Sequence, residues 1–286
     1  MLRRYVHIPR KVLQVSTQNM KGRIVKASIN SLSGTMVDFL ANGTVVALQD
    51  TFRRKGINLV NSELRCAGGN DSLSQIKVIL SLSSVSNQWI AKKDKHPTDK
   101  DAHDIFSLYK LIQSHYLTNG SFSTVIPNTI PMLEFVKNNY GILFGGTTNY
   151  DTTMAKPILH SLEKSGFIFD SFVCANEVSR GRPYPDAILS NLAKLGVSPH
   201  NTIKLGDTYV DMVEGKAAGC ISVGMTDCGN SMGKCLTNSS FYTEGIFNKE
   251  LARESITQEL MEGGADFVIP DITSLGNVLC HIMHNA

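Results

Sequence analysis

The chain has 286 residues and a formal net charge of +3, with 42% apolar and 19% charged residues. This is the composition of an ordinary soluble globular protein of one or two domains. No uninterrupted apolar run approaches the ~18 residues of a membrane span. The six cysteines include no C-x-x-C pair or ligand-like spacing with histidine, which argues against a zinc site and favours reduced thiols inside the cell. The net charge is too small to indicate nucleic acid by itself.

The N-terminal segment is basic. Residues 1–37 contain seven Lys or Arg and no acid, and the first acid is Asp38. This composition is typical of a mitochondrial targeting segment, although Pro9 interrupts a single amphipathic helix. We therefore expect a basic arm at 1–21 and a mitochondrial matrix location, with an arm of no address role and a cytoplasmic location as the alternative. The arm could contact RNA phosphates, but no aromatic residues are interleaved with its charges.

The predicted elements begin with a strand at 22–29. Residues 44–57 and 104–117 then carry apolar residues at helical spacing, and the charged segment 91–104 between them is predicted to be a solvated loop. Trp89 and Tyr109 are expected to pack inside this helical region. The simplest organisation is a helical domain, or cap, at 40–128, inserted into a core made of 22–39 and 129–286.

From about residue 140 the chain alternates between short apolar runs and helical stretches. Strands are predicted at 141–146, 171–177, 202–208, 220–225 and 265–271, and helices at 151–165, 183–195, 211–219, 246–263 and 273–284. This alternation predicts an α/β fold, a Rossmann-like parallel sheet with helices on both faces. The segment 229–234, flanked by Cys228 and Cys235, lacks the pattern of a phosphate-binding P-loop and is expected to be a solvent loop.

Polar residues follow several of these strands. In a parallel sheet, ligands bind outside the carboxyl ends of the strands. Hydroxyl and amide groups there would bind phosphate oxygens, arginine would pair with them bidentately, and carboxylates would hold magnesium. Each group could instead have a purely structural role, in a turn, as a helix cap or as a surface residue. The candidates are Ser31, Thr147, Thr148, Arg180, Arg182, Asp207, Asp211 and Glu214.

Three motifs occur in a telling order: "TTNYD" at 147–151, "SRGRPYP" at 179–185 and "IKLGDTYVDMVEGKAAG" at 203–219. Together they resemble the haloacid dehalogenase superfamily and, within it, the phosphonoacetaldehyde hydrolase family. The resemblance runs from about residue 23 to the C-terminus and is weakest in the inserted helices. It implies a Rossmann-like core with a helical cap, and a magnesium-dependent hydrolase that attacks phosphorus with an aspartate.

The same resemblance implies that two reactive residues are replaced. In the family, the first strand ends in Asp-Trp-Ala-Gly-Thr-Thr-Val-Asp, and matching Gly34 and Thr35 places Ser31 where the nucleophilic aspartate belongs. Asp38 falls on the later, non-nucleophilic aspartate. In the cap, the match places Ser72 where the family has a lysine that forms a Schiff base with the aldehyde. Lys77 lies five residues further on and is a poor replacement.

The same resemblance implies that the residues for phosphate and metal binding are retained. Thr147, with Thr148 beside it, matches the hydroxyl motif, and Arg182 matches the basic motif. Asp207 matches a magnesium ligand, with Asp211 beside it. Tyr150 matches an aromatic residue next to the substrate.

Three functions follow as hypotheses. The first is a catalytically inactive pseudoenzyme that serves as a structural or binding subunit with protein partners, within a mitochondrial assembly; magnesium would then bind weakly or not at all. The second is an active hydrolase, phosphatase-like or phosphonoacetaldehyde hydrolase-like, that acts through Ser31 or through water held at Asp207 and Asp211. The third is a non-catalytic sensor that binds a small phosphorylated ligand through Thr147 and Arg182.

Overall fold

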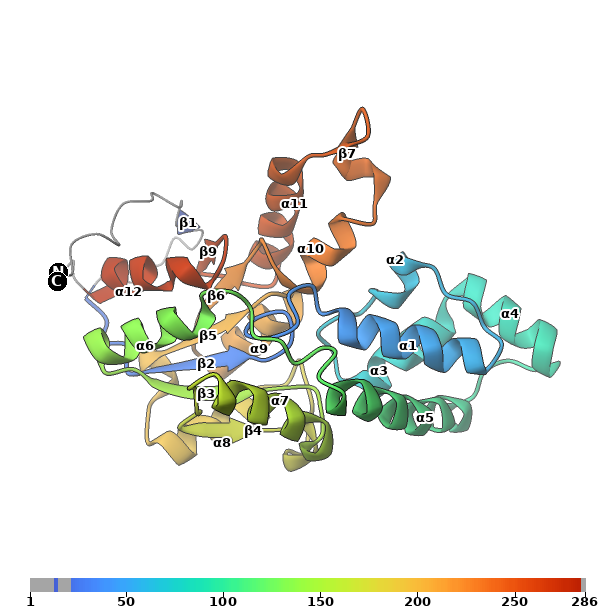
Figure 1. The fold of residues 1–286 in the computed structure, drawn as a ribbon, viewed down its shortest axis with the longest axis horizontal. Coiled ribbons are helices and arrows are strands. Elements are labelled where there is room, and N and C mark those ends of the chain that lie inside the picture. Colours follow the sequence, from blue (N-terminus) through green and yellow to red (C-terminus); the bar gives the residue numbers. More distant parts are fainter. Residues whose placement is uncertain (1–12, 15–21, 284–286) are drawn as a thin grey trace.

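The computed structural model describes residues 13–14 and 22–283, so most of the predicted basic arm lies outside the described residues. Its centre is a seven-stranded sheet in the order β1-β9-β6-β5-β2-β3-β4 (Figure 1). Every neighbouring pair is parallel except β1 with β9. The strands are β1 (Leu13–Gln14), β2 (Ala27–Ser31), β3 (Leu143–Thr147), β4 (Ser171–Val173), β5 (Thr202–Gly206), β6 (Ile221–Met225) and β9 (Phe267–Ile269).

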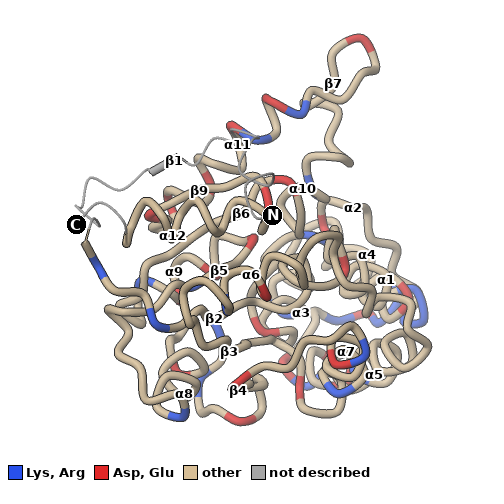
Figure 2. Tube along the Cα trace, turned by 60° about the vertical axis from the view of Figure 1, so that its left-hand side comes forward, with Lys and Arg blue, Asp and Glu red and all other residues tan. Residues whose placement is uncertain are grey.

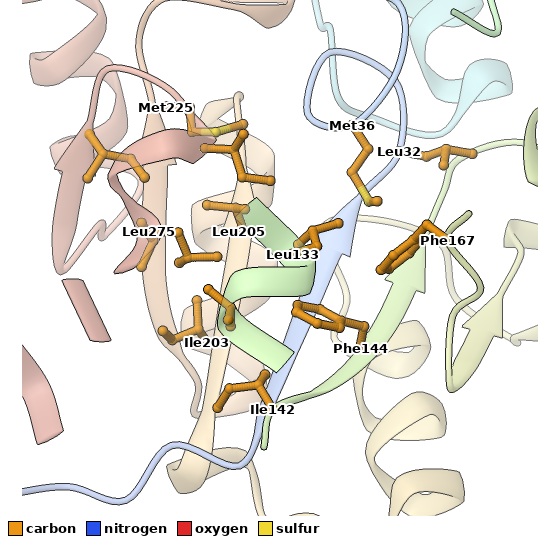
Figure 3. Packing of buried hydrophobic residues seen from close by; sticks show 14 of the residues in the cluster. Leu32, Met36, Leu133, Ile142, Phe144, Phe167, Ile203, Leu205, Met225 and Leu275 are labelled. Atoms are coloured by element: carbon orange, nitrogen blue, oxygen red, sulfur yellow. The ribbon is translucent and has the colours of Figure 1, made fainter. Parts of the chain in front are cut away.

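Helices cover both faces of this sheet, so the α/β fold class predicted from the alternation is confirmed. On one face, apolar residues of β2 pack against α8 (Asp186–Leu195) and the end of α9 (Tyr209–Ala218). On the other, residues of β3, β5 and β6 form the main core with α6 (Thr129–Tyr140), α7 (Thr152–Lys164) and α12 (Leu275–Met283). Figure 3 shows Leu133 and Leu275 meeting Phe144 and Ile203 in this core.

Five of the six helices between β2 and β3 in the chain form a separate body beside the strand ends, which we call the cap (Figure 1). The cap has its own apolar cluster, in which Trp89 and Tyr109 are buried as expected. Its helices are α1 (Asn42–Arg54), α2 (Asn61–Leu64), α3 (Ser72–Ser81), α4 (Ser83–Lys93) and α5 (Asp99–Thr118).

Two segments connect the cap to the core, and they are hydrogen bonded to each other. The Asp38 amide donates to the carbonyl of Thr124 at 3.0 Å, and the Ile126 amide donates to the carbonyl of Met36 at 2.8 Å. Charged residues are spread over the surface of both bodies (Figure 2). Within the described part of the chain, no helix is long and apolar enough to cross a membrane.

The predicted loop at 91–104 is wrong over most of its length. Helix α4 continues to Lys93, where Lys92 and Lys93 complement the negative end of the helix dipole. Helix α5 already begins at Asp99, because Thr98 and Asp101 form a capping box that satisfies its first amides. Only residues 94–98 remain as a loop.

The predicted solvent loop at 229–234 is also wrong, since Gly229–Cys235 forms the short helix α10. Met232 and Cys235, three residues apart, share a buried face that packs with α11 (Lys249–Glu262). Seven residues are too few to show a helical period. Between α10 and α11, the hairpin of β7 (Tyr242–Thr243) and β8 (Ile246–Phe247) projects from the body (Figure 1).

The first core strand begins later than predicted, at Ala27 rather than at 22. All five of its residues are buried, so its sequence shows no alternation from which its bounds could be read.

Candidate active site

The sheet register places three polar side chains next to one another. Ser31 at the end of β2 lies opposite Thr147 at the end of β3. Lys204 in β5 lies opposite Ile29, two residues before Ser31. Because side chains two apart in a strand point to the same face, Ser31, Thr147 and Lys204 lie on the face that α8 and α9 cover.

The Ser31 hydroxyl is fully engaged. It donates a hydrogen bond to Asp211 Oδ1 and accepts hydrogen bonds from Lys204 Nζ at 2.7 Å and from Arg182 Nη2 at 3.0 Å. A hydroxyl has one donor and two acceptor positions, so these three partners use all of them. Ser31 is only 2% exposed and is held at the centre of a charged cluster.

Two cations and two carboxylates make up that cluster. Arg182 and Lys204 each pair with both Asp211 and Glu214, and every member is nearly or completely buried. The distances are 3.0 Å for Arg182 Nη1–Asp211 Oδ1, 3.2 Å for Arg182 Nε–Glu214 Oε2, 3.2 Å for Lys204 Nζ–Asp211 Oδ1 and 3.4 Å for Lys204 Nζ–Glu214 Oε2. Charges removed from water in this way persist only when they are paired.

Lys204 was absent from the residues that the sequence singled out for the site. It also donates to Thr147 Oγ1 at 3.1 Å, beside the 2.8 Å bond from Arg182 Nη2 to the same oxygen. The available signal was a lysine in the middle of the apolar run "TIKLG", where a completely buried strand leaves no solvent to receive its charge.

The cluster sets the pKa values of its acids. Burial raises the pKa of Asp211, but the charges of Arg182 and Lys204 outweigh it and hold that pKa well below its usual range. Burial also pulls the pKa of Arg182 down, and Glu214 and Asp211 more than restore it. Asp207 is different, because burial and the neighbouring Asp211 raise its pKa to about 7.

The two carboxylates implied as magnesium ligands are already engaged. Asp211 carries Ser31 and two cations on one oxygen, and its other oxygen accepts the Thr208 hydroxyl at 2.7 Å. Asp207 accepts hydrogen bonds from Thr35 Oγ1 at 2.8 Å and from the amide of Asn230 at 2.9 Å. In the described part of the chain, no three acidic, histidine or cysteine side chains are grouped as a metal site. This donor set fits a tightly bound magnesium ion poorly.

Two glycines press against Asp207. A Cβ atom on Gly34 would lie 2.6 Å from Asp207 Oδ2, and one on Gly229 would lie 2.0 Å from it, with φ angles of +80° and +79°. Both the left-handed backbone and the contact therefore require glycine. The glycine turn after β2 thus packs directly on the carboxylate that follows β5.

Other candidates have clear structural roles. Thr148 Oγ1 accepts the amide of Tyr150 at 3.1 Å. Arg180 pairs with Asp186 on the surface. Asp38 accepts the amides of Asn42 at 2.9 Å and Gly43 at 2.8 Å, at the start of α1.

Tyr150 joins the core to the cap. Its hydroxyl lies 3.2 Å from Thr44 Oγ1 in α1 and accepts a hydrogen bond from Gln113 Nε2 in α5 at 3.2 Å.

In the cap, Ser72 is the first residue of α3 and is buried, and its hydroxyl lies near that of Tyr109 without a hydrogen bond of ordinary geometry. Lys77 points outward and pairs with Asp99 at 3.0 Å, so its amine does not take the place that Ser72 occupies. Six of the residues predicted for the site come together, and Ser72 stays in the cap. The six are Ser31, Thr147, Arg182, Asp207, Asp211 and Glu214.

A cavity lies between the cap and the strand ends. It encloses about 50 Å³, which is room for a few water molecules. Its lining combines core residues such as Arg182, Asp207 and Asp211 with cap residues such as Gly69 and Gln75. Ser31 is not among the described residues that line it.

The chain matches the haloacid dehalogenase-like hydrolase family over residues 34–219. It is 31% identical over 264 residues to a bifunctional phosphonoacetaldehyde hydrolase/aminoethylphosphonate transaminase from Clostridioides difficile, a match that covers 91% of this chain but only 40% of that protein. It is 29% identical to a phosphonoacetaldehyde hydrolase from Syntrophobacter fumaroxidans, covering 87% of this chain and 88% of the relative.

Solved structures agree with these sequence matches. A phosphonoacetaldehyde hydrolase-like protein from Oleispira antarctica is 27% identical, with a TM-score of 0.84 over 95% of this chain and 97% of that one. A predicted phosphoglycolate phosphatase from Haemophilus somnus, 17% identical with a TM-score of 0.63, shares the fold. The chain belongs to the haloacid dehalogenase-like hydrolase family, with phosphonoacetaldehyde hydrolases among its relatives.

Proposed function

We propose that this chain does not carry out the covalent chemistry of its relatives and instead acts as a structural or binding subunit. The observation that carries the proposal is the environment of Ser31. Its hydroxyl is held by Asp211, Lys204 and Arg182, in the position where the resemblance implies an attacking carboxylate.

Serine attacks phosphorus only when a base removes its proton. Asp211, which receives that proton's hydrogen bond, has a depressed pKa because Arg182 and Lys204 stabilise its charged form, so it is a weak base. Lys204 pairs with two carboxylates and donates to Ser31, so its amine faces the Ser31 hydroxyl as a hydrogen-bond donor. None of the three partners of Ser31 can therefore activate it.

A serine would also give a poor intermediate. A phosphoserine lacks the labile mixed-anhydride bond of an aspartyl-phosphate. The cap offers no amine at Ser72 to form an imine with an aldehyde, because Lys77 is turned outward. The absence of both reactive groups supports lost chemistry more strongly than a changed substrate.

Magnesium would bind weakly or not at all under this proposal. Replacing a carboxylate by Ser31 removes one negative charge, and Arg182 and Lys204 already neutralise the nearest acid. Binding of a phosphorylated ligand is disfavoured for a related reason, because Arg182 and Thr147 are bonded to protein groups that a phosphate would have to displace.

A subunit needs partners, and we propose protein partners in a larger complex, in the mitochondrial matrix if the basic N-terminal segment is a targeting signal. RNA phosphates could be a second contact of that segment. Purification from the native source at low salt tests this proposal. It predicts stable co-purifying proteins, whereas an isolated monomer contradicts it.

The same preparation tests the alternative that the protein is an active hydrolase. A panel of phosphorylated substrates with magnesium should show no phosphate release above that of the Asp207→Asn variant. Release that this variant abolishes would instead support an active magnesium-dependent enzyme.

A further inference from the structure

A buried arginine of the cap reaches across the domain boundary. Arg65, which follows α2, is 3% exposed. Its guanidinium donates to the carbonyl of Leu40 at 2.9 Å, to Asn42 Oδ1 at 2.6 Å and to Asn230 Oδ1 at 3.4 Å. Leu40 belongs to a connecting segment and Asn230 to α10 of the core, so one side chain contacts the cap, its connection and the core.

Glycines make this contact close on both sides of the boundary. A Cβ atom on Gly233 of α10 would lie 2.4 Å from Arg65 Nη1. In the cap, a Cβ on Gly68 would lie 2.1 Å from Asn230 Nδ2, and one on Gly69 would lie 2.5 Å from Thr208 Oγ1. Distances this short leave no room for side chains, so the cap segment 65–69 and the core surface are fitted to each other.

The core side of the contact rests on a rigid support. The amide of Asn230 donates to Asp207 Oδ2 at 2.9 Å, directly after the central strand β5. A further bond runs across the boundary nearby, from Asn149 Nδ2 to the carbonyl of Asn70 at 3.2 Å. The cap segment is therefore held against the carboxyl ends of β3 and β5.

We infer that Arg65 is a latch that holds the cap closed over the cavity. Moving the cap away from the core would break the bond from Arg65 to Asn230 Oδ1 and the 3.5 Å bond from Asn230 Nδ2 to the Arg65 carbonyl, and it would undo the close packing of segment 65–69 on the core. The described acceptors of its hydrogen bonds are neutral oxygens. The inference does not depend on the proposed function, because a closed cap would govern access to the cavity in an active enzyme as well.

The alternative is that Arg65 only braces the cap internally, through Leu40 and Asn42. Two variants of the full chain separate these roles. Arg65→Ala removes the arginine. Gly233→Ala leaves the cap sequence intact, raises the helix propensity of α10, and places a methyl group where the guanidinium lies.

Amide hydrogen exchange measured by mass spectrometry supplies the readout. Peptides covering 65–71 and 228–235 report on the boundary, and peptides of β5 and β6 report on the core. Arg54→Ala is the matched control, because Arg54 is a cap arginine that is 59% exposed and pairs with Asp50.

The latch predicts that both Arg65→Ala and Gly233→Ala raise exchange in the two boundary peptides by at least about tenfold, an opening penalty lowered by about 1.4 kcal/mol. Exchange in β5 and β6 should stay at the wild-type level, as should all exchange in Arg54→Ala. The inference is overturned if Gly233→Ala leaves boundary exchange unchanged. It is also overturned if Arg65→Ala raises exchange only inside α1–α5, which would identify a brace within the cap.

Discussion

Replacement of Lys204 by methionine tests whether the strand-end cluster stabilises the protein. Lys204 is completely buried and contacts Asp211 and Glu214 at 3.2 and 3.4 Å. The cluster contains two carboxylates and two cations, a formal charge of zero. Lys204→Met changes this to −1 and leaves Arg182 as the only described cation paired with Asp211 and Glu214.

The expected cost follows from the unpaired charge. Removing one partner from a buried ion pair typically destabilises a protein by about 3–5 kcal/mol, a large part of a total stability of about 5–15 kcal/mol. The double variant Lys204→Met/Glu214→Gln restores the formal charge of zero. We therefore expect it to be more stable than the sum of the two single changes predicts, with a coupling free energy of about 1–3 kcal/mol.

Urea unfolding at pH 7 measures these free energies, provided that the slope with denaturant is unchanged. Lys77→Met is the matched control, because its ion pair with Asp99 is exposed on both sides and should be worth at most about 1 kcal/mol. A cost for Lys204→Met below about 1 kcal/mol, or strict additivity in the double variant, would refute the stabilising role of the cluster.

Three further predictions follow from the site. Asp207 keeps its proton to about pH 7 in the folded chain but ionises near 3.8 when unfolded, so its contribution to stability falls as pH rises from about 4 to 7. Over this range, the free energy of unfolding of Asp207→Asn should rise relative to that of the wild type, by at most roughly 4 kcal/mol in urea titrations. A pH-independent difference would count against the raised pKa. Ser72→Ala should destabilise the protein by less than about 0.5 kcal/mol, because the Ser72 hydroxyl lies near that of Tyr109 without a hydrogen bond of ordinary geometry; a loss above about 1 kcal/mol would show that the two hydroxyls form a full hydrogen bond. Ser31→Asp introduces a carboxylate beside Asp211, so magnesium should stabilise this variant by up to about 2.7 kcal/mol at a hundredfold excess over Kd and the wild type much less. Equal stabilisation would contradict the weak-magnesium proposal.

The sequence predicted the sheet because each strand ended in small or polar residues before a helical stretch. It also brought Ser31, Thr147, Arg182 and Asp207 to one edge, since parallel strands end on the same side. The sequence did not predict which groups form hydrogen bonds with Ser31. Lys204 lies three residues before Asp207, and only the register of β5 beside β2 brings it to the Ser31 hydroxyl.

Two other features depend on tertiary contacts. Helix α10 forms where a Gly-rich, polar segment favoured a loop, because Met232 and Cys235 are buried against α11 and packing overrides propensity. The sequence around Arg65 does not indicate what its side chain contacts, because its acceptors Leu40 and Asn230 lie far from it in the chain.

The central claim is that Ser31 does not act as a nucleophile, and a direct assay of phosphonoacetaldehyde cleavage tests it. Purified protein is incubated with phosphonoacetaldehyde and magnesium, and released phosphate is measured for the wild type and for Ser31→Ala. We predict equal, background release from both. Phosphate release by the wild type that Ser31→Ala abolishes would contradict the claim.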